Sequence, residues 1–251
     1  MPGTSVTVLI LGGTGEARAL ARSLHEGGVE VISSLAGRVA DPRLPVGPVR
    51  IGGFGGIGPM TDWLRGNGIR VVVDATHPFA ATITAHAVTA CTDAGIPLLR
   101  LRRPAWAPGP EDGWQRVPTL AEAARILGDG APRRVLLTTG RQDVGEFAGV
   151  ESAWFLIRVV DPPTAALPPH HEILRSRGPY RLEAERELLR ENRIDTLVTK
   201  DSGGELTRPK LDAARELGVQ VIMVDRPAEP AGLRTVDAVP DAHTWVIQQL
   251  S

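Results

Sequence analysis

A polar segment follows an apolar run in the stretch VVVDATHPFA, residues 71–80. Three consecutive valines predict a buried strand, and a strand that merely turned would end in Gly or Asn. This strand instead leads into Asp74, Thr76 and His77, which are two titratable groups and a hydroxyl. A lone histidine is more often structural, but a place at a strand end beside an acid and a hydroxyl favours a functional role for His77.

A second polar segment, TKDSGG at 199–204, follows another apolar run and combines a cation, a hydroxyl and two glycines. Lys200 can hold a phosphate or a ribose there, and Ser202 and the Gly203 amide add hydrogen-bond donors. Lys200 and Lys210 are the only lysines among 28 basic residues. The excess of arginine is typical of a GC-rich genome, and it also suits a ligand that carries many carboxylates or phosphates.

A Gly-rich turn, GGTG, lies between the first predicted strand and the first predicted helix in LILGGTGEARAL. Small residues there let the backbone approach a dinucleotide pyrophosphate at the helix N-terminus. The match to G-x-G-x-x-G is imperfect. When the motif is aligned from Gly13, Arg18 stands at its last position, which calls for a small residue. When it is aligned from Gly12, Thr14 replaces the second glycine and Ala17 stands at the last position. The context favours a dinucleotide site, and a tight turn in a domain with another ligand is the alternative.

The end of the second predicted strand indicates which dinucleotide binds. NAD enzymes usually place an acid there for the ribose hydroxyls, whereas this chain has Ser33, Ser34 and Arg38, with no acid before position 41. Hydroxyls and an arginine suit a 2′-phosphate, so we predict NADP, the alternative being that Arg38 is a solvated loop residue. Gly52 and Gly53 end the third strand, where they either admit a ribose or adenine or form a simple turn.

Short apolar runs alternate with helical periodicity along the whole chain, which predicts an α/β fold with parallel sheets. The segments NGIRVVVDATHPFA…DAGIPLLRLRRP and ENRIDTLVTKDSGG…ELGVQVIMVDRP share one order of elements, although any two βαβ units resemble each other to some degree. If the repeat is genuine, the two polar segments lie at the carboxyl ends of matching strands, where open α/β sheets bind ligands.

The stretch RRPAWAPGPEDGW at 102–114 is rich in Pro and Gly and lacks a period, so we expect a linker between domains there. One domain is then expected at 1–103 and a second at 104–251. We expect HHEILRSRGPY at 170–180 to lie in a Pro-rich loop, and a last helix over 241–250 to close the chain.

The composition narrows the classes of partner and location. A net charge of −1 favours neither nucleic acid nor a membrane surface, and no apolar run reaches the ~18 residues that span a bilayer. A lone cysteine, Cys91, and a start without signal-peptide features predict a cytoplasmic protein. His170 and His171 lack partners at metal-ligand spacing, so we predict no metal. The oligomeric state stays open, with a monomer preferred.

Six motifs taken together resemble a known family: LGGTGEAR, SLAGR, DATHPFA, TTGR, RGPY and VTKDSGG, in this order, are similar to the precorrin-6A reductases of cobalamin (vitamin B12) biosynthesis. The resemblance covers essentially the whole chain, and DATHPFA and TKDSGG are its most specific parts. It implies NADPH-dependent reduction of one ring double bond of a cobalt-free macrocycle, precorrin-6A, to give precorrin-6B. It also implies two Rossmann-like domains with cofactor and substrate in a cleft between them.

The resemblance also implies roles for individual residues. Asp74 and His77 are expected to be catalytic, beside Thr76 and the nicotinamide. His77 is the natural proton donor because its ordinary pKa is near neutral, while solvent and a substrate carboxyl are the other sources. Glu16 and Arg18 are expected to shape the cofactor end of the cleft. The residues expected to meet the carboxylate arms of the substrate are Arg141, Arg177 and Tyr180, the last standing where the family has Phe.

Two other functions compete with this one. A reductase of the short-chain type needs a Tyr-x-x-x-Lys pair, but Tyr180 is the only tyrosine and Ala184 stands where the lysine is required. A non-catalytic NADP-binding sensor or regulatory protein would bind nucleotide without turnover. Such a protein would need neither the second polar segment nor the arginine-bearing loops LTTGR and RSRGPY.

Overall fold

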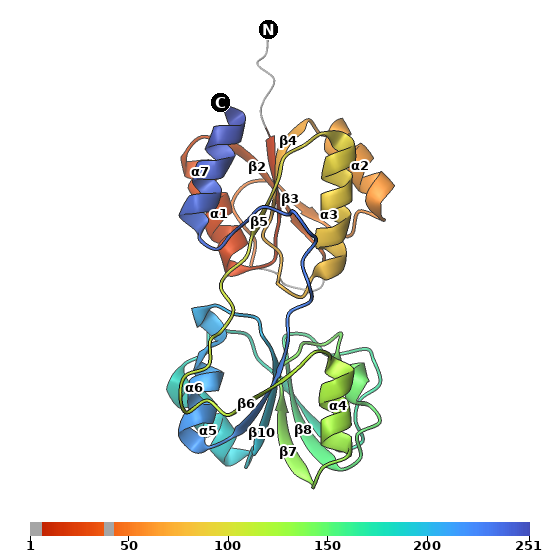
Figure 1. Ribbon diagram of the computed structural model, residues 1–251, viewed down its shortest axis with the longest axis vertical. Coiled ribbons are helices and arrows are strands. Elements are labelled where there is room, and N and C mark those ends of the chain that lie inside the picture. Colours follow the sequence, from red (N-terminus) through yellow and green to blue (C-terminus); the bar gives the residue numbers. More distant parts are fainter. Residues whose placement is uncertain (1–6, 38–42) are drawn as a thin grey trace. The chain divides into compact units, whose positions relative to one another are not determined.

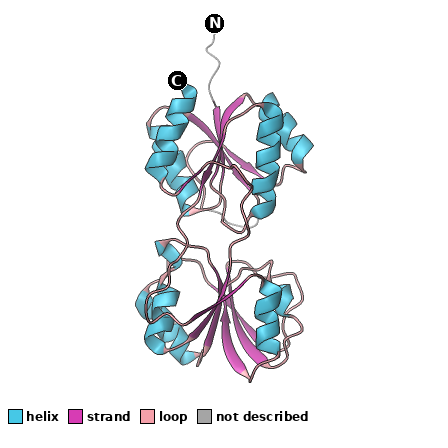
Figure 2. Cartoon of the chain, in the orientation of Figure 1, coloured by secondary structure: helices cyan, strands magenta, loops and turns pink. Residues whose placement is uncertain are grey.

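The computed structural model describes residues 7–37 and 43–251, which form two compact units (Figure 1). The first unit contains Met1–Pro104 together with Pro227–Ser251, and the second contains Ala105–Arg226. Each unit is a parallel six-stranded sheet with helices on both faces (Figure 2). The predicted α/β fold with two parallel-sheet domains is confirmed.

The sheet of the first unit has the strand order β12-β5-β4-β1-β2-β3. Helices α1 and α7 cover one face and α2 and α3 the other (Figure 1). Because the order reverses beside β1, the unit is a Rossmann-like sheet with its switch point between β1 and β4. Its elements are β1 (Thr7–Leu11), α1 (Gly15–Glu26), β2 (Glu30–Leu35), β3 (Val49–Ile51), α2 (Ile57–Gly66), β4 (Ile69–Asp74), α3 (Ala81–Ala94), β5 (Leu98–Leu101), β12 (Thr235–Val236) and α7 (Val239–Leu250).

The sheet of the second unit has the strand order β6-β11-β10-β7-β8-β9, so β7 takes the place that β1 has in the first unit. Helices α5 and α6 pack side by side on one face, and α4 covers the other (Figure 1). Its elements are β6 (Trp114–Val117), α4 (Leu120–Gly128), β7 (Arg133–Leu137), the 3-10 helix η1 (Val144–Phe147), β8 (Ala153–Val159), β9 (His171–Arg175), α5 (Leu182–Glu191), β10 (Thr196–Lys200), the 3-10 helix η2 (Glu205–Thr207), α6 (Pro209–Leu217) and β11 (Gln220–Val224).

The two halves of the chain exchange their last strand and helix. After β5 the chain crosses to the second unit, to which it contributes β6 and α4. After β11 it returns to the first unit, to which it contributes β12 and α7. This topology confirms the sequence repeat, because β4-α3-β5 and β10-α6-β11 occupy equivalent places. The predicted second domain, 104–251, is therefore wrong for its last 25 residues, since Pro227–Ser251 belongs to the first unit.

The physical reason for this correction is burial of the C-terminal segment on the first sheet. Thr235 and Val236 pair with Arg100 and Leu101 of β5. On α7, Ala242, Trp245 and Val246 are buried in the same apolar cluster as β1 and α1. A pattern of helix and strand cannot show which sheet an exchanged element joins, because the apolar face of α7 would suit either.

Three strands were missed in the sequence, and all three are edge strands. β6 begins at the last residue of the expected linker, β9 lies in the expected Pro-rich loop, and β12 precedes the last helix. Each is short and mostly half-buried or exposed, so it lacks the continuous apolar run by which buried strands are recognised.

The valine run of β4 shows why the central strands were predictable. Val71 and Val73 face the apolar cluster under α1 and α7, while Val72 faces the cluster under α2 and α3. All three side chains are fully buried, because β1 and β5 flank β4 and helices cover both of its faces. Each contributes roughly 1.5–3 kcal/mol of burial, which holds the carboxyl end of β4, and thus Asp74, in a constant position.

Candidate active site

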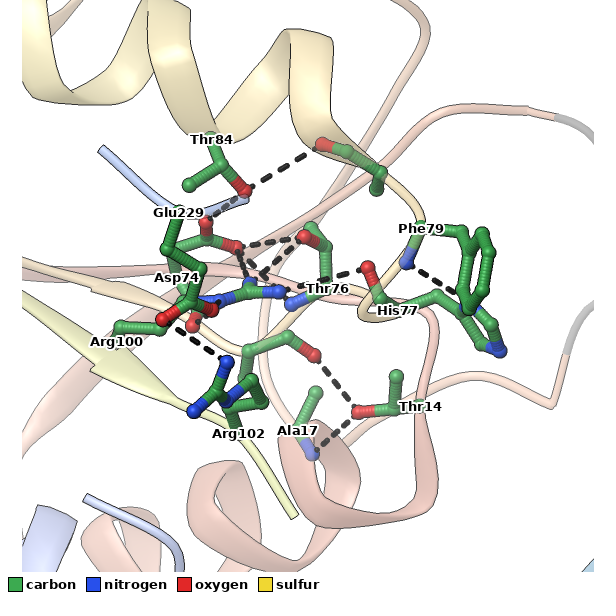
Figure 3. Close-up of polar contacts among 12 residues, drawn as sticks. Thr14, Ala17, Asp74, Thr76, His77, Phe79, Thr84, Arg100, Arg102 and Glu229 are labelled. Carbon is green, nitrogen blue, oxygen red and sulfur yellow. Dashed lines mark hydrogen bonds and ion pairs between the residues drawn. The ribbon is translucent and has the colours of Figure 1, made fainter. Parts of the chain in front are cut away.

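The Gly-rich turn is tied to the end of β4 by one hydroxyl. Thr14 caps α1: its Oγ1 accepts a hydrogen bond from the Ala17 N–H at 3.1 Å and donates one to the Ala75 carbonyl at 2.8 Å (Figure 3). Gly13 adopts a φ of 112°, a region that favours glycine, and Gly12 precedes it. The turn thus presents small residues at the N-terminus of a helix, the arrangement that binds phosphate.

A pocket lies beside this turn, and its wall carries an unsatisfied hydroxyl. Ser33 Oγ is buried and has no hydrogen-bond partner among the described residues. Partial burial and then the charge of Arg43 lower the pKa of the Arg18 guanidinium, while Glu16 acts in the opposite direction. An anion would relieve that repulsion and could accept from Ser33 Oγ. The pocket is lined by Gly12, Gly13, Ala17, Arg18, Ser33, Leu35, Arg43 and Pro45; the predicted Arg38 lies outside the described residues.

The segment after β3 is shaped by an arginine that the sequence did not single out. Arg50 donates from Nη1 to the Gly52 carbonyl at 2.6 Å and from Nη2 to the Gly53 carbonyl at 2.7 Å. Its Nη1 also lies 3.4 Å from Ser34 Oγ, and its Cζ lies 3.8 Å from the centre of the Phe54 ring. Ser34 therefore supports this segment, and the two glycines are held in place by their carbonyl groups.

Asp74 lies at the end of β4 and is enclosed by donors. Its Oδ1 accepts from Thr76 N–H at 3.0 Å and Thr76 Oγ1 at 2.7 Å, and lies 2.7 Å from Arg100 Nη1 (Figure 3). Its Oδ2 accepts from Thr84 Oγ1 at 2.6 Å. The side chain is 0% exposed. Both oxygens are engaged and shielded from solvent, an arrangement that suits holding the turn in place, and the catalytic role expected of Asp74 stays a prediction.

Arg100 of β5 holds the same turn from the other side. Besides the Asp74 carboxylate, it donates from Nη1 to Thr76 Oγ1 at 3.0 Å and from Nη2 to the His77 carbonyl at 3.5 Å. Its Nε lies 3.4 Å from Glu229 Oε1, in the segment that returns to the first unit. At 1% exposure, Arg100 is a buried cation whose contacts fix the backbone that carries His77.

The His77 side chain lies beside Phe79, away from the Asp74 carboxylate (Figure 3). Its Nδ1 accepts a hydrogen bond from the Phe79 N–H at 3.2 Å. Because an acceptor nitrogen carries no proton, the neutral ring bears its hydrogen on Nε2. In this geometry the half-buried ring carries a hydrogen-bond donor at Nε2, and it can give up a proton only after Nδ1 is protonated as well.

The predicted residues of the second unit gather at the carboxyl ends of β7 and β10. Lys200 Nζ forms an ion pair with Asp143, two residues after Arg141, so the TTGR loop and the TKDSGG segment are joined. The Ser202 N–H donates to the Lys200 carbonyl at 2.7 Å, and Gly203 is buried with a φ of 67°. Arg141 is half-buried.

The loop RSRGPY carries the remaining predicted residues. Arg177 is exposed. Tyr180 is half-buried, with its ring stacked against Arg158 at 4.0 Å, from Cζ to ring centre. The tyrosine thus has a structural partner in its own unit.

Three arginines important for the site were missed: Arg43, Arg50 and Arg100. Arg100 had a signal in the sequence, since it is a charged residue inside the apolar strand LLRL, one strand away from a buried acid. Arg43 and Arg50 had none, because one lies in a Pro-rich loop and the other in a short edge strand.

Within 7–37 and 43–251, no group of three or more His, Cys, Asp and Glu side chains could hold a metal ion. In the same ranges, no helix combines the length and the hydropathy needed to cross a membrane.

Comparison with known proteins shows the family. Residues 7–246 match the model of the precorrin-6x reductase family CbiJ/CobK. The chain belongs to this family. It is 55% identical over 240 residues to the precorrin-6A reductase of Rhodococcus erythropolis, covering 95% of this chain and 96% of the relative. The precorrin-6A reductase of Rhodobacter capsulatus is 44% identical, covering 89% of both chains.

A solved structure supports the same assignment. A CobK precorrin-6A reductase superposes with a TM-score of 0.92 at 40% identity, covering 97% of each chain. The chain is accordingly a reductase of the cobalamin pathway, and nothing in these comparisons supports a non-catalytic sensor.

Breaking the buried pair tests its importance for this reductase. Asp74→Asn should lower the free energy of unfolding by about 3–5 kcal/mol, because the buried Arg100 charge then keeps only its longer contact with the partly exposed Glu229. The matched control is Asp62→Asn on α2, whose exposed side chain should change it by less than about 0.5 kcal/mol. Urea denaturation followed by circular dichroism measures both, and equal stability of the two variants would contradict the account.

Proposed function

We propose that this chain is an NADPH-dependent reductase that reduces one ring double bond of precorrin-6A to give precorrin-6B. The observation that carries the proposal is the 55% identity to a precorrin-6A reductase over 95% of the chain. A cobalt-free substrate is favoured because relatives named cobalt-precorrin-6A reductase are only 30–36% identical. A soluble macrocycle and a chain with one buried cysteine, Cys91, fit a cytoplasmic enzyme.

The first unit suits NADPH better than NADH. No acid ends β2; instead the pocket offers the unsatisfied Ser33 Oγ with the guanidinium groups of Arg18 and Arg43. A 2′-phosphate would accept from all three, whereas a bare 2′-hydroxyl would leave two cations facing each other. We assign the pyrophosphate to the N-terminus of α1, which is also the placement supported by the small residues of the turn. The residues assigned to the cofactor here are Gly12, Gly13, Thr14, Glu16, Ala17, Arg18, Ser33 and Arg43.

Other cofactor contacts stay proposals. Ser34, Gly52 and Gly53 flank the pocket region through β2 and β3, and Arg38 is kept as a second candidate for the phosphate. Thr76 sets the turn that is proposed to meet the nicotinamide. In the second unit, the residues that we propose to hold a phosphate or ribose of the cofactor are Lys200, Ser202 and Gly203.

Bound NADPH supplies the hydride, and the protein supplies position and a proton. We propose His77 as the proton donor through its imidazolium form, in which Nδ1 is protonated and the hydrogen bond from the Phe79 N–H is released before Nε2 gives up its proton. Asp74 and Arg100 act by holding the backbone of the turn. Solvent and a substrate carboxyl are the competing proton sources.

The carboxylate arms of the macrocycle need cationic partners, and we propose Arg141 and Arg177 for them. Both lie on loops of the second unit that follow β7 and β9. Guanidinium groups bind carboxylates through two parallel hydrogen bonds, so such contacts orient the ring as well as attract it.

The reaction itself is tested by following NADPH absorbance after precorrin-6A is added, with NADH in a parallel reaction. We expect oxidation with NADPH and conversion of precorrin-6A to a product two hydrogens heavier by mass spectrometry. Oxidation with neither nucleotide, while NADPH still binds, would refute the reaction and favour a nucleotide-binding sensor.

The cofactor preference is tested at the pocket. Arg43→Ala should weaken NADPH binding about tenfold, because about 1.4 kcal/mol of charge-assisted bonding is lost, and leave NADH binding unchanged. Arg22→Ala, an exposed arginine on α1, is the matched control. Arg38→Ala is measured beside it, and an unaltered ratio of NADPH to NADH affinity in both Arg43 and Arg38 variants would overturn the phosphate site.

A further inference from the structure

A buried ion pair in the second unit includes Arg158, the residue on which the Tyr180 ring stacks. Arg158, near the end of β8, and Glu185, in the first turn of α5, approach to 2.6 Å between Nη1 and Oε1. Their side chains are 4% and 3% exposed. Glu185 Oε2 has no hydrogen-bond partner among the described residues. Because desolvation of two charges costs several kcal/mol, and apolar residues often fill such a site equally well, stability alone does not account for the pair.

The pair supports one aromatic ring. The Arg158 guanidinium lies 4.0 Å from the centre of the Tyr180 ring. The Tyr180 hydroxyl donates to the Ser176 carbonyl at 3.3 Å, and the Tyr180 N–H lies 3.5 Å from the Leu206 carbonyl. Tyr180 is therefore held by its ring, its hydroxyl and its backbone, and it joins the RSRGPY loop to the TKDSGGELT segment.

The loop is also fixed at its two ends. The Ser176 N–H donates to the Val159 carbonyl at 2.9 Å, next to Arg158, and the Glu185 N–H donates to the Arg181 carbonyl at 3.0 Å. Residues 176–181 are thus attached to the strand and the helix that carry the ion pair. Between these attachments Arg177 points its charge to solvent, since the residue is exposed.

We propose that Arg158 and Glu185 are positioning residues for substrate binding: through the Tyr180 ring they set the 176–181 loop so that Arg177 meets a carboxylate arm of the macrocycle. This inference rests on the proposed role of Arg177. Glu185 fixes the plane of the guanidinium, the guanidinium fixes the ring, and the ring fixes the loop. The tyrosine ring is then the link whose removal uncouples the buried pair from the surface arginine.

The test compares the affinity for precorrin-6A, as KM and as an equilibrium Kd without cofactor, in Tyr180→Leu and Arg177→Ala. A cation–π contact of about 1 kcal/mol corresponds to about fivefold, so Tyr180→Leu should raise KM and Kd about fivefold with kcat and NADPH affinity unchanged. Tyr180→Phe keeps the ring and should stay within about twofold of the original chain. In the Arg177→Ala background, Tyr180→Leu should add nothing, because the two act through one contact.

A matched control separates positioning from stability. Trp154, near the start of β8, stacks on Arg134 at 3.9 Å, from Cζ to ring centre. Trp154→Leu removes the same kind of contact at the other end of the strand, so it should lower stability without changing KM.

The double variant Arg158→Met/Glu185→Leu replaces the pair by apolar side chains of similar size, which keeps the interior filled. It should unfold at a temperature close to that of the original chain and still raise KM and Kd like Tyr180→Leu.

The proposal would be overturned by an unchanged Kd in Tyr180→Leu or in the Arg158→Met/Glu185→Leu variant, by additive effects of Tyr180→Leu and Arg177→Ala, or by an equal rise in Trp154→Leu. An Arg177→Ala variant that binds precorrin-6A normally would also overturn it, while leaving the reductase assignment intact. If the original chain binds precorrin-6A without reducing it, the proposed reaction fails, but the comparison of Kd values still decides the positioning role.

Discussion

The buried pair of Asp74 and Arg100 is the interaction on which the candidate site depends. Both side chains are at most 1% exposed, so each charge would be costly without the other. The cost is offset by a full set of partners: two threonine hydroxyls and a backbone amide for the carboxylate, and carbonyl and carboxylate oxygens for the guanidinium. The pair holds the DATH turn in one conformation while His77 remains at its edge.

The second unit solves the same problem with other residues. At the end of β10, Asp201 is 1% exposed, with Oδ2 accepting from Arg116 of β6 at 2.9 Å and Oδ1 accepting from the Trp106 N–H at 3.1 Å. Each buried aspartate thus lies in a network that reaches the segment by which the chain enters its unit: Glu229 near Asp74, and Trp106 near Asp201. Each polar turn is therefore bonded to the segment by which the chain enters that unit.

Much of the fold could be predicted because burial leaves a pattern in the sequence. Continuous apolar strands such as β4, and the Gly-rich turn before α1, were recognised with their polar ends, and the repeat pointed to two similar sheets. The exchange of β12 and α7 could not be predicted, because pairing partners leave no periodicity. Arg100 and Arg43 were missed for a related reason: their importance comes from residues distant in sequence, Asp74 in one case and the pocket wall at Ser33 in the other.

We propose that this buried pair presents His77 as the proton donor of the reduction. The most direct measurement is kcat of His77→Ala at saturating NADPH and precorrin-6A, beside the Kd for NADPH and the melting temperature. We expect kcat to fall about 100-fold, since general acid catalysis contributes at least that much, with the Kd for NADPH and the melting temperature unchanged. Near-normal turnover would contradict it, and would leave solvent or a substrate carboxyl as the source of the proton.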